Sequence, residues 1–246
     1  MPPAPKDSPA RWPATRRYTS VDLDLFADPG AVPPLVVDLG GPRRVLSTAV
    51  LGGGLTVAQS WLCVTVAGDY SRMDPGEDLR ERAAALGLPG PTVGMLTGVD
   101  VRRVERRTVG AASVHATVGV GRGVAAAGDR PPDWGPIGTI NLLIEVDAPL
   151  TDDALVGAMQ TAVEAKVQAL ADARIPARNA GGWATGTPTD ALCIAVPEGG
   201  TVPFAGTATA VGADIAHAVH EAVLAGALAD RADHAAALAR RDSSAH

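Results

Sequence analysis

Short apolar runs separated by turns recur through most of this 246-residue chain, and they constrain its fold more than any other feature. Up to residue 146 only one helical pattern, at 77–88, interrupts them. Closely spaced strand patterns favour an antiparallel or mixed sheet, because antiparallel neighbours need only a short connection. We expect strands at 34–39, 43–50, 61–66, 92–98, 104–109, 113–120, 140–146 and 191–196.

Glycine-rich stretches place the turns in this pattern. The first two strands are expected to pair across a turn made of Gly40, Gly41 and Pro42. The GGG run at 52–54 lacks the Lys-Ser/Thr that follows a phosphate-binding loop, so it predicts a tight turn near a site.

The second half of the chain is more helical. Thr151 is expected to N-cap a helix that Pro176 ends, and a last helix is expected from about Val211 to Leu228. The predicted inward positions of the two helices are Leu155, Met159, Val163, Val167, Leu170, Ile215, Val219, Val223 and Leu224. Helices that bracket sheets predict a single layered α/β domain of the α+β type, with mixed or antiparallel sheets.

The two ends of the chain differ from its middle. We expect a disordered leader over 1–17, one domain over 18–230 and a fraying helical tail over 231–246. The leader has no apolar core of a signal peptide, and no apolar run approaches the roughly 20 residues of a membrane span, so we expect a cytoplasmic protein without membrane contact. A net charge of -6 and 3% aromatic residues argue against nucleic-acid binding.

Cysteine and histidine give no metal-site pattern. Cys63 and Cys193 each lie inside an apolar run, which is typical of reduced core thiols. His217 and His220, followed by Glu221, share a helix face, but no third ligand accompanies them and a solvated face is the better interpretation. We therefore expect no metal.

Hydroxyl side chains mark two candidate sites. Thr139 follows Gly138 at the start of a buried strand. The loop before another strand holds Thr185, Gly186, Thr187, Thr189 and Asp190, with three hydroxyls and a carboxylate within six residues. Loops at strand ends commonly build binding sites, although strand propensity and turn chemistry alone also account for these residues.

The order of several motifs resembles the adenosylcobinamide amidohydrolase family. They are RVLSTAVLGGGL, Asp69-Tyr70 followed by MDPGEDLRE, VGMLTGVDV, GTINLLIEVDAPLTDDAL, EAKVQAL, ATGTPTDALCIAV and FAGTATAVGADIAHAVHEAV, over about residues 40–228. The resemblance implies hydrolysis of the amide between aminopropanol and a corrin side chain, giving adenosylcobyric acid for cobalamin salvage. The corrinoid is then substrate, and no cofactor is expected.

The chain departs from the family pattern at two turns. The family usually has asparagine where this chain has Gly52, and Ser-Asn where it has Gly121-Arg122. These departures leave open a corrinoid-binding protein without catalysis. With the resemblance, we predict that Gly53, Gly54, Tyr70, Thr185, Gly186 and Thr187 bind the substrate.

A more distant resemblance concerns Thr139. The run from Thr139 to Leu150, with the helix and Thr-Asp loop after it, is similar to the L-aminopeptidase/D-amidase and ornithine acetyltransferase superfamily. Those enzymes cut themselves before a Ser or Thr, which then acts as an N-terminal nucleophile. The resemblance implies cleavage of Gly138–Thr139, after which the α-amine, with an ordinary pKa near 7.7, can serve as base.

Three catalytic residues are predicted. Thr139 is the nucleophile, Asn141 orients the site from the same strand face by period two, and Asp190 is the candidate acid of the loop. The alternatives are an ordinary strand threonine in an intact chain, with a water activated by Asp190 or another acid, and acyl transfer to an amine instead of water. A homo-oligomer is plausible, because sheet edges often pair.

Overall fold

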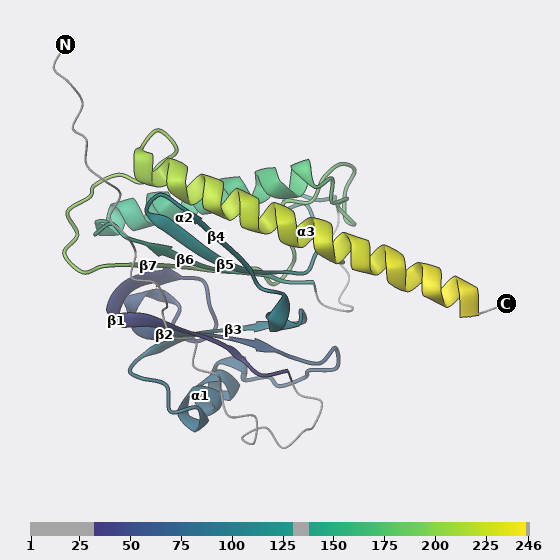
Figure 1. Ribbon diagram of the computed structural model, residues 1–246, viewed down its shortest axis with the longest axis horizontal. Helices are drawn as coiled ribbons and strands as arrows, with labels where there is room; N and C mark the ends of the chain where they lie inside the picture. The colour runs from purple at the N-terminus through teal and green to yellow at the C-terminus, as the bar shows by residue number, and fades with distance from the viewer. Residues whose placement is uncertain (1–31, 130–137, 245–246) are drawn as a thin grey trace, which may run out of the picture.

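The computed structural model describes residues 32–129 and 138–244, and its seven strands form one mixed sheet (Figure 1). The strand order is β3-β2-β1-β7-β6-β5-β4, with β2–β3 and β6–β7 parallel and the other neighbours antiparallel. The strands are β1 (Leu35–Ser47), β2 (Gly54–Thr65), β3 (Thr92–Thr97), β4 (Glu105–Val109), β5 (Ala112–Val118), β6 (Ile140–Val146) and β7 (Ala191–Val196).

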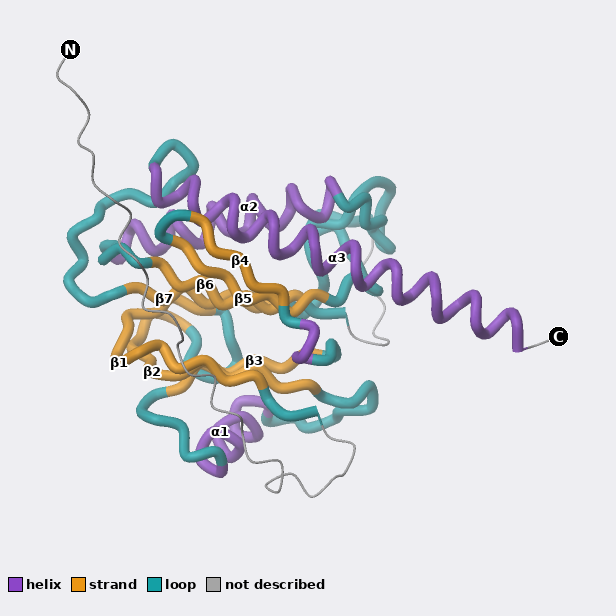
Figure 2. The backbone as a smooth tube through the Cα atoms, viewed as in Figure 1, coloured by secondary structure: helices purple, strands orange, loops and turns teal. Residues whose placement is uncertain are grey.

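The sheet is folded into two layers that face each other. Figure 2 shows β4–β7 lying over β1–β3, and the two groups are joined where residues Arg44 to Ser47 of β1 pair with β7. An apolar cluster fills the space between the layers, with Trp61 and Met95 from one layer and Leu143 and Cys193 from the other.

Helices cover the outside of both layers, as expected for a layered α/β domain. The long helices α2 (Asp152–Asp172) and α3 (Ala210–Ser244) pack on the outer face of β4–β7, and α1 (Pro75–Ala85) packs on β1–β3 (Figure 1). A short 3-10 helix, η2 (Val101–Arg103), follows β3. Within the described ranges, no helix is both long and apolar enough to span a membrane.

Helix α2 begins where its cap predicts, and three of its five predicted inward residues, Leu155, Met159 and Leu170, pack in the core. The Thr151 hydroxyl accepts a hydrogen bond from the Ala154 amide, which confirms the N-cap. Val163 is 39% exposed, so the prediction that it faces inward was wrong, and Val167 is half-buried. The buried stripe is made mainly of Ala154, Leu155, Ala158, Ala162, Ala165, Ala169 and Leu170. These small side chains allow α2 to lie close against both α3 and the sheet.

Several predicted boundaries differ from the structure, most of all in β1, β2 and α3. The strand expected at 61–66 already begins at Gly54. Residues 34–39 and 43–50 do not pair with each other across Gly40, Gly41 and Pro42. Residues 35–39 and 43–47 belong to one strand, β1, and both parts pair with β2, so residues 39–42 bulge opposite Gln59. Gly40 and Gly41 have φ of 75° and 119°, and such glycine conformations suit a bulge as well as a hairpin turn.

Helix α3 continues to Ser244, well beyond the expected end at Leu228. Its predicted inward residues Ile215, Val219 and Val223 are buried, and Leu224 packs against the same core. The proposed tail from residue 231 is thus helical, with exposed side chains over 231–236. The proposed leader, 1–17, lies outside the described residues.

Candidate active site

A cavity of about 210 Å³ lies where β2 and β3 end and β6 and β7 begin. Its wall is mostly apolar. The lining residues are Val50, Val66, Tyr70, Pro75, Met95, Leu96, Thr97, Gly98, Thr139, Asn141, Thr189 and Ala191. Three predicted site residues, Thr139, Asn141 and Tyr70, therefore meet in one cavity, although Tyr70 lies far from the other two in the sequence.

Thr139 stands at the entrance to β6 and is 2% exposed. Its Oγ1 is 2.7 Å from Oγ1 of Thr189, and its carbonyl oxygen accepts a hydrogen bond of 2.9 Å from the amide of Gly119. The preceding Gly138 packs against the same loop, since a Cβ there would lie 2.7 Å from the Gly119 carbonyl oxygen. Only glycine fits this approach, so the backbone position of Thr139 is closely defined.

Asp190 lies beside the cavity and fixes the first residue of β6. Its Oδ1 accepts hydrogen bonds from the Ile140 amide, at 3.0 Å, and from the Thr187 hydroxyl, at 2.5 Å. Its Oδ2 accepts from the Thr187 amide, at 3.1 Å, and pairs with Nζ of Lys166. Both oxygens are thus engaged by donors, and Asp190 holds the first residue of β6 next to Thr139.

Lys166, which the sequence analysis missed, completes this arrangement from α2. It is 6% exposed, and its ion pair with Asp190 is almost wholly buried. Gly186 leaves room for the pair, because a Cβ there would lie 2.5 Å from Oδ2 of Asp190 and 2.8 Å from Nζ of Lys166. The sequence held one signal that Lys166 is buried: it follows the inward Ala165 in a helix whose buried stripe is mostly apolar.

Asn141 lies on the same strand face as Thr139, as period two predicts, and is completely buried. Its Nδ2 donates to the Leu96 carbonyl oxygen at 2.8 Å and contacts Sγ of Cys63 at 3.6 Å. No described residue donates a hydrogen bond to its Oδ1. An unpaired buried acceptor costs about 1–3 kcal/mol, so this oxygen is the one conspicuously unsatisfied polar atom of the cavity wall.

The thiol beside Asn141 is inert. Burial raises the pKa of Cys63 to about 11, and it raises the pKa of Cys193 to about 12. Both cysteines are free and buried, as expected for core thiols, and both remain protonated at neutral pH.

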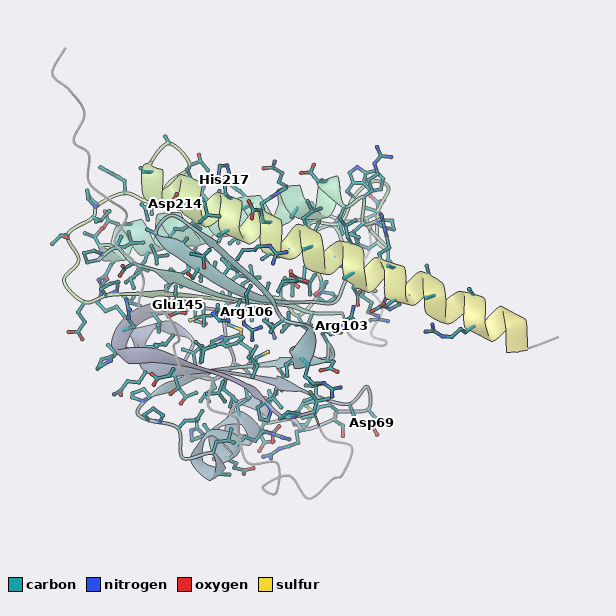
Figure 3. The ribbon with its side chains drawn as sticks, in the orientation of Figure 1. Asp69, Arg103, Arg106, Glu145, Asp214 and His217 are labelled. Carbon is teal, nitrogen blue, oxygen red and sulfur yellow. The ribbon has the colours of Figure 1, made fainter. Side chains whose placement is uncertain are left out.

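Tyr70 reaches the cavity from the loop after β2, next to Asp69, which Figure 3 labels. Its hydroxyl donates to Oδ2 of Asp78 at 3.1 Å, and burial together with this carboxylate raises the tyrosine pKa. Asp78 is itself buried and pairs with Arg72 and Arg82 of the same region. This network fixes the loop that forms one wall of the cavity.

The other predicted binding residues shape the neighbouring turns and do not line the cavity. A Cβ at Gly53 would lie 2.4 Å from the Ala49 carbonyl oxygen, and Gly54 has a φ of 85°. The Thr185 hydroxyl accepts from the Ala126 amide at 2.9 Å. Gly186 and Thr187 surround Asp190 as described above. Thr189, the third hydroxyl of the candidate loop at 185–190, is the member of this loop that lines the cavity, although it was not among the predicted binding residues.

The two departures from the family pattern lie outside the cavity wall. Gly52 has a φ of 68°, and a Cβ there would lie 2.7 Å from the Thr92 carbonyl oxygen. The backbone nitrogen of Arg122 lies close to Gly138, because a Cβ on Gly138 would be 3.1 Å from it. Gly52 and Arg122 therefore lie in turns that support the cavity.

His217 and His220 of α3 lie in different surroundings. His217 and Glu221 are exposed, and Nε2 of His220 is 2.8 Å from Oδ2 of Asp172. In the part of the chain that the structure describes, no three histidine, cysteine or carboxylate side chains converge as metal ligands. The solvated helix face is the interpretation that this arrangement supports.

Comparison with known proteins identifies the family to which this site belongs. The model of the adenosylcobinamide amidohydrolase family matches residues 25–235. The chain belongs to this family. A protein of Halobacterium salinarum named adenosylcobinamide amidohydrolase is 34% identical over 203 residues, covering 76% of this chain and 82% of that protein. One of Methanosarcina mazei with the same name is 29% identical over 196 residues, covering 76% and 90%. The resemblance to the adenosylcobinamide amidohydrolase family is confirmed, and the chain is an enzyme that hydrolyses an amide.

Proposed function

We propose that this enzyme hydrolyses the amide between aminopropanol and the corrin side chain of adenosylcobinamide, and that the adenosylcobyric acid formed re-enters cobalamin synthesis. The family match over 25–235 carries the proposal, and the names of both relatives agree with it. The corrinoid is the substrate in this reaction, so its presence in the site is transient.

The nucleophile we propose is Oγ1 of Thr139. Among the described residues that line the cavity, Tyr70 is the only titratable one, and its raised pKa keeps it protonated at neutral pH. The carboxylate of Asp190 is already engaged by Lys166 and by backbone and hydroxyl donors. A nucleophile in such a site needs a base of its own, and the α-amine of an N-terminal threonine supplies one.

The free amine would arise by self-cleavage of Gly138–Thr139. Oγ1 of Thr139 attacks the Gly138 carbonyl carbon, the peptide nitrogen leaves as the α-amine, and water hydrolyses the resulting ester. Oγ1 of Thr189 lies 3.4 Å from the Gly138 carbonyl oxygen, from where it can donate to the developing oxyanion.

Turnover then follows in two steps. The α-amine accepts the Oγ1 proton as Oγ1 bonds to the substrate carbonyl carbon, and it returns the proton to aminopropanol as the C–N bond breaks. Water attacks the acyl-enzyme next, so that the corrin carboxylate leaves and Thr139 regains its hydroxyl.

The test combines product analysis with the mass of the protein. Adenosylcobinamide is incubated with the purified enzyme, and mass spectrometry should detect adenosylcobyric acid, aminopropanol and a protein fragment that begins at Thr139. Products from a chain that remains intact would overturn self-cleavage but retain the hydrolase. Transfer of the acyl group to an added amine, in preference to water, would identify an acyltransferase instead.

A further inference from the structure

We infer that the amine half of the substrate enters the cavity, and that Oδ1 of Asn141 accepts a hydrogen bond from its hydroxyl group. The inference rests on the proposed function and adds a recognition element: the site selects a small amine that carries a hydroxyl donor. Three features of the cavity carry it, namely its size, the orientation of the Asn141 amide and the distance from Thr139.

The size of the cavity limits what can enter. Its volume of about 210 Å³ is ample for several water molecules, since each needs at least about 10–15 Å³ of such space. An amide carbonyl with aminopropanol attached fits into it, whereas a corrin macrocycle is several times larger. In the proposed complex the macrocycle stays at the mouth of the cavity while the amide arm reaches Thr139.

The orientation of the Asn141 side chain is fixed by its neighbours. The atom 2.8 Å from the Leu96 carbonyl oxygen must be the nitrogen, because two oxygens without a hydrogen between them would repel. The same nitrogen contacts Sγ of Cys63. Oδ1 is therefore the atom left for a ligand, and it can only accept a hydrogen bond. Asn141 is consequently unsuited to stabilising an oxyanion but suited to a hydroxyl donor.

The spacing of Thr139 and Asn141 favours the hydroxyl over the amide N–H. Alternate residues of an extended strand are about 6.6 Å apart. When the reacting carbonyl carbon of the substrate lies over Thr139, the substrate's amide nitrogen is only one bond nearer to Asn141. The N–H therefore does not reach Oδ1. The hydroxyl oxygen lies three bonds beyond that nitrogen, so an extended aminopropanol group can bring it to Oδ1.

The experiment compares two amides of adenosylcobyric acid, one with 1-amino-2-propanol and one with propylamine, which lacks only the hydroxyl. The wild-type enzyme should hydrolyse the propylamide with kcat/KM about 10- to 100-fold lower. Asn141→Leu should lower kcat/KM for the aminopropanol amide by a similar factor and so abolish the preference. The ratio of the two substrates is the readout, because a general loss of stability would affect both equally.

Thr117→Val is the matched control, since Thr117 is buried opposite Asn141 on β5 and does not line the cavity. It should keep the wild-type preference. Equal hydrolysis of both amides by the wild-type enzyme would overturn this inference and leave the proposed function intact. Hydrolysis of neither amide would overturn the proposed function and this inference with it. Asn141→Ala serves as a second variant if Asn141→Leu does not fold.

Discussion

The two faces of strands β5 and β6 are built for different purposes. The face under α2 and α3 carries only apolar side chains, which are Ala112, Val114, Ala116, Val118, Ile140, Leu142, Ile144 and Val146. The face toward β1–β3 carries Ser113, His115, Thr117, Asn141, Leu143 and Glu145, and Figure 3 shows Glu145 and Arg106 pointing into the space between the layers. The cavity opens on the second face.

The difference shows how one sheet separates stability from chemistry. The apolar face packs against two long helices and supplies the larger core of the molecule. This core holds the backbone of β6 in place, so polar residues on the opposite face can be positioned at fixed separations. Substitutions on the cavity face should therefore lower mainly the activity, and substitutions on the apolar face should lower mainly the stability.

The largest effect is expected on activity at the cavity. Thr139→Ala removes the proposed nucleophile and should lower kcat by at least about 10⁴-fold. The variant should unfold at nearly the wild-type temperature, because only one hydroxyl contact, to Thr189, is lost. Steady-state kinetics and calorimetry on the same sample measure both quantities. Wild-type turnover in this variant would remove Thr139 from the mechanism.

An intermediate effect is expected at the ion pair between Asp190 and Lys166. Both the activity and the free energy of unfolding should fall there. Asp190→Asn leaves Lys166 buried without its carboxylate, which should reduce the free energy of unfolding by about 3–5 kcal/mol. Activity should also fall, since Asp190 holds Ile140 beside Thr139. Denaturant titration measures the stability. The double variant Asp190→Asn/Lys166→Met should recover much of it, and a double variant no more stable than Asp190→Asn would contradict a charge effect.

The smallest effect is expected on the apolar face. Ile144→Val removes one buried methylene and should reduce the free energy of unfolding by about 0.5–1.5 kcal/mol, with kcat unchanged. Chemical denaturation and steady-state kinetics test this prediction together. A fall in kcat comparable to that of the Asp190 variant would show that the two faces are not independent.

Local patterns in the sequence predicted most of the elements and one part of the site. Period two placed Thr139 and Asn141 on one strand face, and the Thr151 cap placed the start of α2. The turn at Gly40 and Gly41 was predicted wrongly, because a bulge and a hairpin turn use the same glycine conformations. The outward position of Val163 was also missed, since hydrophobicity alone does not reveal that alanines face a closely packed helix.

The sequence by itself determined the fold class, the family and the strand face that bears Thr139 and Asn141. Those properties depend on residue spacing and on motifs that are local in the chain. Only the tertiary structure decided that Tyr70 and Thr189 share the cavity with Thr139, and that Lys166 pairs with Asp190. These contacts join segments separated by tens of residues, and they depend on the fold of the sheet between β1 and β7, for which no local pattern carries a signal.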